Sequence, residues 1–500
     1  QIGSGGGVGA TNRSVVVGVF GGDGVDRGVD KATRTPDRSD EFMTVDGGRL
    51  RTLRADEMVY LGGGSTNPLL ISQASASADA NVNINFESEF LEFSRHSITN
   101  ALNQTITKRV VGDATFNSIR FGIVRGDPFI YGTSTNQPTD LGRSLLMDDG
   151  VRLASESGML LFGRDTGSSD GDATPAGSMF IYNGTIDLDG AANNREAIIQ
   201  NDSGNNIYLR SSIQASQGLT KGGQGNVMLN VANQLGGTVS VAQANLYLLH
   251  GGALNGATDL RLSGDGLLIM AGGIAVTNDI RLTTSPMPYG NRIIYSESGH
   301  NLWAGDIAIN NVDNQGLIVH DMRLGAGING QNSTLTLLGD IGRVDSGAIS
   351  DIYMIDAPQV TTIESAGILN LKGTFGDRLD QDGNAVPFDP TGTGQTRVEG
   401  GSMLNRAANE NDVLRFRIDG PSIASFYGDE LAVNIYKPWN SAGRIDAQQG
   451  TIRFLGDPSL GEGEFWTSNA LAVANFANGL SGFVLAGSGT EANGSVTFLL

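Results

Sequence analysis

Residues 227–248 read VMLNVANQLGGTVSVAQANLYL, and this stretch decides the fold class. Short apolar runs alternate residue by residue with polar positions, and glycine and asparagine separate one run from the next. Both of these residues tolerate the left-handed backbone conformation that tight turns need. Alternation with a period of two, interrupted by turn residues, predicts short β-strands joined by turns.

The same texture recurs along most of the chain, whereas helical periodicity is almost absent. Inward-facing apolar positions between residues 227 and 302 repeat every 19 to 21 residues, in two interleaved series: Leu229, Leu248 and Ile269; and Val241, Leu262, Leu282 and Leu302. A repeat of about 20 residues with short strands is typical of a solenoid, in which every coil adds one strand to each of several parallel sheets. We therefore predict an all-β fold, a parallel β-helix (β-solenoid) with coils of about 20 residues and irregular loop insertions.

Composition predicts two regions. Residues 1–50 are rich in glycine and charged residues, so we expect an irregular or docking segment there. Residues 51–500 contain no proline- and serine-rich linker between independent cores, and we expect a single elongated β-solenoid.

Charge and composition also exclude several classes of protein. The formal net charge of −20 argues against nucleic acid and anionic membranes as partners. No apolar run reaches the roughly 18 residues of a membrane-spanning helix, so we expect no direct membrane insertion. The chain has 72 glycines but only 13 prolines and no triplet period, which excludes collagen. It has no cysteine, which excludes disulfides and favours an exported protein.

Residues 218–229, GLTKGGQGNVML, resemble the start of the autotransporter-associated β-strand repeat. Three further segments fill the second strand, the third strand and the turn that follows it: 236–241 (GGTVSV), 244–248 (ANLYL) and 251–254 (GGAL). The best match is 218–254, and a similar texture extends over 100–340. The resemblance implies a right-handed parallel β-helix in a large, surface-exposed bacterial protein. It implies no catalytic residues.

Two acidic loops are candidate calcium sites. Residues 185–190 (TIDLDG) and 378–383 (RLDQDG) each match the acidic spacing of a calcium-binding loop except at the first position. The candidate ligands are Asp187, Asp189 and Glu196 in the first loop and Asp380, Asp382 and Asp389 in the second. The alternative is simple Asp–Gly turn chemistry, which this composition favours. The fold requires no cofactor, and Ca²⁺ is the one candidate.

Enzyme signatures are weak. The four histidines are scattered, without the spacing of a zinc site, and no nucleophile elbow is present. We predict a non-catalytic, extracellular structural or adhesive β-helical module at the cell surface of a Gram-negative-type bacterium. Its expected partners are copies of itself or adjacent segments of the same large protein, in a fibre, layer or longer rod, and surface glycans. The alternative is a β-helical polysaccharide-active enzyme or a phage tailspike-like glycan-binding protein.

Overall fold

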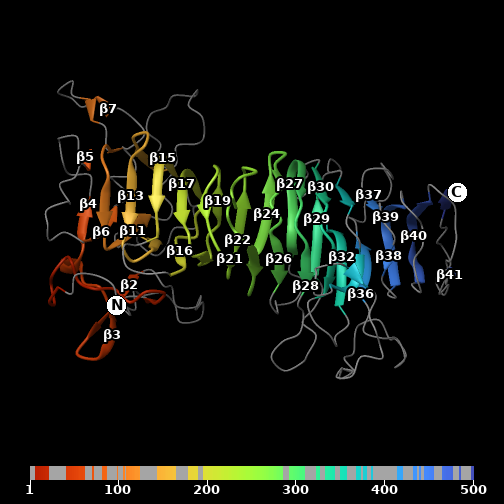
Figure 1. Ribbon diagram of the computed structural model, residues 1–500, viewed down its shortest axis with the longest axis horizontal. Helices are drawn as coiled ribbons and strands as arrows, with labels where there is room; N and C mark the ends of the chain where they lie inside the picture. The colour runs from red at the N-terminus through yellow and green to blue at the C-terminus, as the bar shows by residue number, and fades with distance from the viewer. Residues whose placement is uncertain are drawn as a thin grey trace, which may run out of the picture. The chain divides into compact units, whose positions relative to one another are not determined.

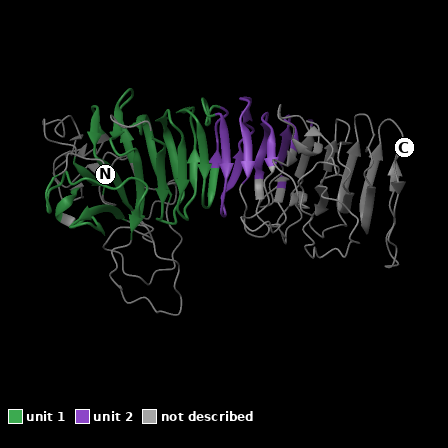
Figure 2. Ribbon diagram, turned by 60° about the horizontal axis from the view of Figure 1, so that its bottom comes forward, with its two compact units in different colours: residues 1–246, 252–257 green, residues 247–251, 258–500 purple. Residues whose placement is uncertain are grey.

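The computed structural model is essentially all-β, and Figure 1 shows its strands. The chain divides into two compact units, which Figure 2 colours separately. Unit 1 comprises Gln1–Leu246 and Gly252–Ala257, and unit 2 comprises Tyr247–Gly251 and Thr258–Leu500. The structure describes residues 6–21, 41–61, 70–71, 82–86, 98–99, 105–106, 109–123, 143–164, 178–189, 195–284, 292–309, 322–326, 333–343, 350–356, 367–372, 375–379, 385–386, 414–419, 432–435, 439–440, 444–454, 464–476, 484–485 and 497–499.

Unit 1 contains two long parallel sheets. In the first, each strand pairs in parallel with the next: β4 (Val59–Leu61), β6 (Asn83–Phe86), β11 (Ser118–Ile123), β14 (Met159–Arg164), β16 (Ala197–Asn201), β18 (Leu219–Gly222) and β21 (Thr238–Val241). The second contains β5 (Leu70–Ile71), β9 (Arg109–Val110), β10 (Ala114–Phe116), β12 (Arg143–Met147), β13 (Arg152–Ser155), β15 (Met179–Asp187), β17 (Ile207–Ala215), β19 (Val227–Leu229) and β20 (Gln234–Leu235). Strand β22 (Asn245–Leu248) crosses the boundary between the units. In Figure 1, β13, β15 and β17 lie side by side, as their pairing requires.

Equivalent residues lie over one another from strand to strand, which builds buried ladders. One ladder in the first sheet is Ile84, Ile119, Leu160, Ile199, Lys221 and Val241. Beside it, the rings of Phe86 and Phe121 stack at 5.2 Å, and those of Phe121 and Phe162 at 4.8 Å. All three rings are fully buried, so each adds apolar burial and ring stacking to the core.

The N-terminal residues of unit 1 pack against the outer face of the first sheet. Strands β1 (Phe20–Gly21), β2 (Glu41–Asp46) and β3 (Arg49–Thr52) form an antiparallel sheet, and η2 (Ala55–Glu57) is a single 3₁₀ turn. Five apolar residues of this N-terminal segment form a cluster with three residues of β14 and β16: Val15, Val17, Phe42, Leu53 and Met58 against Met159, Leu161 and Ile198. Strands β7 (Ile98–Thr99) and β8 (Thr105–Ile106) form a separate antiparallel pair.

Unit 2 also contains two sheets of mainly parallel strands. One has β23 (Asp259–Leu262), β26 (Arg281–Thr284), β28 (Ile307–Ile309), β31 (Ile341–Arg343), β34 (Phe375–Leu379), β35 (Ala385–Val386), which is antiparallel to β34, and β38 (Trp439–Asn440). The other has β24 (Leu267–Ala271), β25 (Ala275–Val276), β27 (Arg292–Trp303), β29 (Met322–Ala326), β30 (Ser333–Leu337), β32 (Ser350–Asp356), β33 (Gly367–Leu371), β36 (Leu414–Asp419), β37 (Ala432–Ile435), β39 (Arg444–Phe454), β40 (Glu464–Phe476), β41 (Val484–Leu485) and β42 (Thr497–Leu499).

The prediction of an all-β chain with long parallel sheets is confirmed, and the sheets are consistent with a solenoid. The spacing of about 20 residues holds only locally, since Ile199 pairs with Lys221 and Lys221 with Val241, 22 and 20 residues apart. Ile119 pairs with Leu160, 41 residues away, because a long insertion separates these strands.

One predicted series of equivalent residues is wrong in its register. Leu282 pairs with Leu260 rather than Leu262, and its next partner is Ile307. Leu302 belongs to the other sheet of unit 2, where it pairs with Ala275. Residues two apart on a strand face the same way, so a constant spacing identifies the face but not the partner.

Candidate functional site

The acidic residues of the first predicted calcium loop lie at the end of β15, where protein donors surround them. Asp187 is 3% exposed, and its carboxylate pairs with Arg152 of β13, whose Nε donates at 2.5 Å. The other oxygen of Asp187 accepts the backbone N–H of Asp189 at 2.8 Å. This carboxylate therefore ties two neighbouring strands together.

Asp189 accepts two hydrogen bonds from the strand on the other side. The backbone N–H of Ser216 donates to it at 2.5 Å, and Nε2 of Gln214 donates at 2.9 Å. Burial alone would raise the pKa of Asp189, but these donors outweigh it and lower the pKa below its usual value. Asp189 is therefore a carboxylate held in its charged form by its neighbours.

The remaining predicted ligands are placed differently. Glu196 is exposed, and its Oε1 accepts a hydrogen bond from the hydroxyl of Thr220 on β18, in the other sheet. Asp380, Asp382 and Asp389 lie outside the described residues. Among the residues that the structure does describe, no three acidic, histidine or cysteine side chains are grouped so as to hold a metal ion. Calcium binding by these loops stays a prediction.

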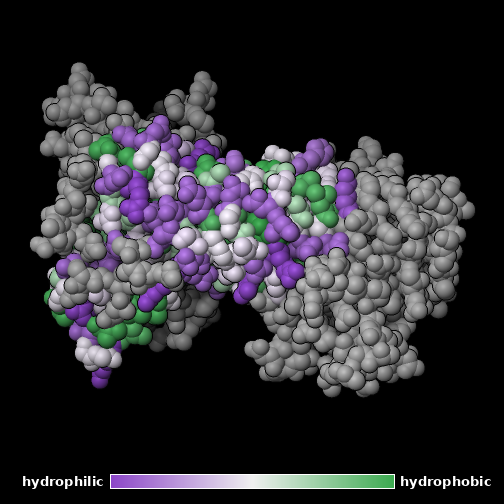
Figure 3. Space-filling view, viewed as in Figure 1, coloured by the Kyte–Doolittle hydropathy of each residue, from purple (hydrophilic) through white to green (hydrophobic). Residues whose placement is uncertain are grey.

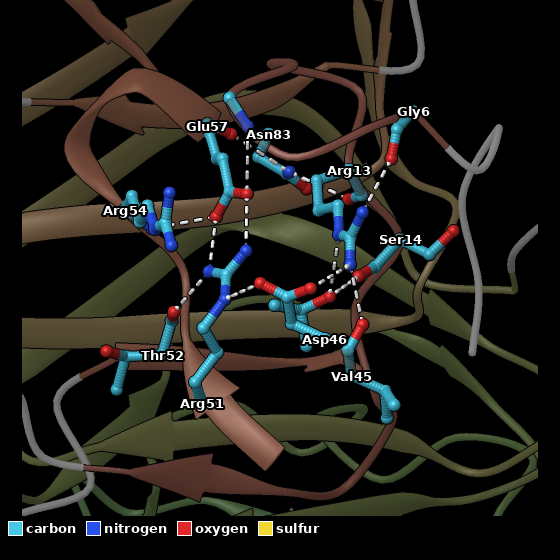
Figure 4. A network of polar contacts seen from close by, with 12 residues as sticks. Gly6, Arg13, Ser14, Val45, Asp46, Arg51, Thr52, Arg54, Glu57 and Asn83 are labelled. Carbon is cyan, nitrogen blue, oxygen red and sulfur yellow. Dashed lines mark hydrogen bonds and ion pairs between the residues drawn. The ribbon is translucent and has the colours of Figure 1, made fainter. Parts of the chain in front are cut away.

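A second polar cluster, which we call the Glu57 network, anchors the N-terminal segment (Figure 4). Glu57 is fully buried, and Arg51 donates to both of its carboxylate oxygens at 2.7 Å. The backbone N–H groups of Arg54 and Gly9 donate to the same carboxylate at 2.9 and 3.2 Å. Arg51 also donates to Asp46 at 2.9 Å, so one guanidinium joins two acids.

The electrostatics of the Glu57 network follow from these donors. Burial by itself would raise the pKa of Glu57, but the guanidinium of Arg51 and the two backbone donors lower it from 4.5 to about 2. The hydrogen bond with Glu57 in turn raises the pKa of Arg51. Both groups therefore stay charged across the physiological pH range.

Asparagine side chains join the Glu57 network to the first parallel sheet. Nδ2 of Asn83, the first residue of β6, donates to the backbone carbonyls of Arg13 and Glu57 at 2.9 and 3.1 Å. Nδ2 of Asn117 donates to Oδ1 of Asn83 at 2.6 Å and also reaches the carbonyl of Arg13. The N-terminal segment thereby completes the hydrogen bonding of the sheet beside it.

Lys221 is the least expected buried charge. It lies in the aliphatic ladder between Ile199 and Val241 and is 1% exposed. Its ammonium group donates to the backbone carbonyl of Gly223 at 2.8 Å and to that of Gln243. Gln243 is 22 residues further along the chain, so the lysine links successive strands of the stack.

The sequence analysis singled out neither Glu57 nor the buried role of Lys221. Lys221 stands two residues after Leu219, which is buried, so the period of two could have placed both on the inward face. Glu57 offered no comparable signal, because its partners come from residues 9, 51 and 54, which turns rather than regular spacing bring together.

Comparison of the chain with protein-family models, curated proteins and solved structures gives no match. In the part of the chain that the structure describes, no helix has the length and apolar character to span a membrane.

Proposed function

We propose that this chain is a non-catalytic structural or adhesive module, built as a β-helical rod and exposed on a bacterial surface. The observation that carries the proposal is the repeated parallel pairing in register, which places Ile119, Leu160 and Ile199 directly over one another. Such a stack satisfies backbone hydrogen bonds along its axis and buries aliphatic side chains inside. Rigidity along one direction is the mechanical property that a spacer or fibre segment needs.

The spacing of paired residues supports a coiled arrangement of these sheets. Partners 20 to 22 residues apart between Ile199 and Val241 fit one turn of a β-helix. Longer separations elsewhere fit coils that carry loop insertions. The right-handed sense rests on the resemblance of residues 218–254 to the autotransporter-associated repeat.

The charged groups of unit 1 support a structural role. The side chains of Asp187, Glu57 and Lys221 each bind donors or acceptors from neighbouring segments. Buried charges used in this way hold strands in register, and their carboxylates are occupied by protein donors. On the face that Figure 3 shows, hydrophilic residues are interspersed with smaller apolar patches over the described surface.

Self-association completes the proposal. A stack of parallel strands ends in strands that have unpaired backbone groups, and these groups favour continuation by another segment of the same kind. Partners of this sort are copies of the chain or adjacent segments of one large protein. The absence of cysteine suits an exported location.

Electron microscopy of the negatively stained full chain, over a range of protein concentrations, tests the assembly. We expect rods that lengthen or associate laterally as concentration rises, with matching species in sedimentation velocity. Short isolated rods at every concentration would refute self-assembly.

A reducing-end assay with pectin, alginate and bacterial surface glycans tests the absence of catalysis. We expect no turnover. Turnover that is lost in Asp187→Asn or Asp189→Asn, but kept in Asp56→Asn, would show instead that the chain is a polysaccharide-active enzyme.

A further inference from the structure

An aromatic ladder covers the outer face of β15 and β17 in unit 1. Ile181 and Leu209 on these strands are buried, so Phe180, Tyr182, Tyr208 and Arg210 point to the opposite face. The rings of Phe180 and Tyr208 stack at 4.7 Å with 16° between their planes. The rings of Phe180 and Tyr182 lie 5.8 Å apart and 19° from parallel.

Arg210 lies across this ladder. Its guanidinium carbon is 5.1 Å from the ring centre of Phe180 and 5.2 Å from that of Tyr182. Nη1 of Arg210 also donates to the hydroxyl of Tyr182 at 3.4 Å. Arg210 is exposed, whereas Phe180 beneath it is 5% exposed. The aromatic rings therefore support one face of the guanidinium and leave its edge accessible.

Arg210 differs from the arginines that form ion pairs in this protein. Within the described residues, five arginines have a carboxylate within 4 Å: Arg13, Arg51, Arg120, Arg152 and Arg261. Arg210 has no such carboxylate among the residues that the structure describes, although the chain carries a net charge of −20. Its contacts are the aromatic rings and one phenolic oxygen, which leave most of its N–H donors unused.

A guanidinium held in this way is prepared to bind a planar anion. Stacking on aromatic rings restricts the side chain before a ligand arrives, so less entropy is lost on binding. The free N–H groups form a fork whose geometry matches a carboxylate through two parallel hydrogen bonds. The hydroxyls of Tyr182 and Tyr208 can act as donors or acceptors toward neighbouring hydroxyl groups.

The strand pairing favours a saccharide over a peptide as the bearer of this carboxylate. Both edges of β15 are paired, with β12 and β13 on one side and β17 on the other. Strand β17 is likewise paired with β15 and with β19 and β20. No strand edge is open here for an extended peptide to add its backbone hydrogen bonds. A sugar needs only side-chain groups, and this face supplies them.

We infer that Arg210, supported by Phe180, Tyr182 and Tyr208, forms a binding site for a carboxylate-bearing saccharide, a uronate. This site goes beyond the proposed structural role, because it gives the rod a specific ligand on one flank. The overall negative charge of the chain repels long polyanions, so short uronate segments are the suitable ligands. With one charged contact on an open face, we expect affinity of about 1 mM.

Isothermal titration calorimetry on the full chain tests the inference, with tetragalacturonate as the probe. Its methyl ester is the neutral counterpart, hexaglutamate is an anionic peptide, and a sulfated tetrasaccharide tests the choice of anion. We expect tetragalacturonate to bind and the other three probes to bind at least about tenfold more weakly, because each lacks the carboxylate, the sugar or the planar anion.

Variants assign the binding to Arg210. Arg210→Gln should weaken tetragalacturonate binding by about tenfold or more, and Arg210→Lys should recover only part of it, because an ammonium group lacks the planar fork. Arg261→Gln is the matched control, since Arg261 is also exposed on a strand but pairs with Asp259. Its binding should stay within about twofold of the wild type. Circular dichroism checks that each variant keeps its β-structure.

Several outcomes would overturn the inference. Equal binding of the methyl ester would remove the carboxylate from the argument, and equal or tighter binding of hexaglutamate or the sulfated sugar would assign the site to another ligand. No heat signal up to about 10 mM would mean that no such site exists. A lowered melting temperature of Arg210→Gln with unchanged binding would make the ladder purely structural.

Discussion

Glu57→Gln tests whether the Glu57 network holds the N-terminal segment in place. The substitution keeps the shape of the side chain but removes the charge that Arg51 neutralises. The pKa of Glu57 is lowered from 4.5 to about 2, and each pKa unit corresponds to about 1.4 kcal/mol. The charged form of Glu57 therefore stabilises the folded segment by about 3 kcal/mol at pH 7.

The stabilisation by Glu57 has a defined pH dependence. Because the folded pKa is below the unfolded one, the contribution is complete above pH 4.5 and is lost as the pH falls toward 2. At pH 3 about 1 kcal/mol should remain. Glu57→Gln should therefore be much less stable than the wild type at pH 7 and nearly equal to it at pH 2.

Hydrogen–deuterium exchange with mass spectrometry measures this effect locally, in peptides that cover residues 41–58. Exchange rates corrected for the intrinsic pH dependence give the free energy of opening in each variant. Asp56→Asn is the control, because Asp56 is the exposed neighbouring acid. A difference below about 1 kcal/mol at pH 7, or one that does not change with pH, would refute the role assigned to Glu57.

Three further substitutions test the packing of each unit. Phe121→Ala should cost about 3–5 kcal/mol in urea denaturation, because it removes the central ring of a buried stack, and a cost below about 1 kcal/mol would contradict that packing. Lys221→Met should be close to neutral or stabilising and Lys221→Ala destabilising by about 2 kcal/mol or more in the same assay, since methionine fills the ladder without a buried charge; the reverse order would contradict this account. Burial, with repulsion from Asp340 and Asp279, raises the pKa of Asp306, so the favourable protonated state is lost as pH rises through that pKa. Asp306→Asn should therefore raise the unfolding midpoint at pH 7 but not at pH 3, and an equal shift at both pH values would exclude a charge effect.

The sequence predicted the local structure well where its alternation is regular. The runs within residues 227–248 correspond to β19, β21 and β22, and apolar alternation predicted their buried faces. Positions that require positive φ carry glycine, as at Gly237 (φ 54°) and Gly256 (φ 85°). At Gly256 an added Cβ would also lie 2.0 Å from the carbonyl oxygen of Leu235, so no larger residue fits.

Which strands pair could not be read from the sequence, because partners are separated by loops of unequal length. A period of two identifies residues that share a face, but it gives neither the next strand nor the register. This is why Leu302 was assigned to the wrong series while its neighbours were correctly expected to be strands.

The candidate sites show the same division. The sequence located Asp187 and Asp189 in a turn after a strand, but only the structure placed Arg152 and Gln214 beside them. The aromatic ladder under Arg210 likewise needs β15 and β17 to lie in register, although their sequences are 28 residues apart at Phe180 and Tyr208.

The amino-acid sequence by itself determined that this chain forms short strands with glycine and asparagine turns, since those preferences are local properties of the backbone. Tertiary structure decided which strands are neighbours, which charges are buried and which side chains meet. Those outcomes depend on contacts between residues 20 to 41 positions apart or more, and the physical cost of each alternative register appears only when the whole stack is assembled.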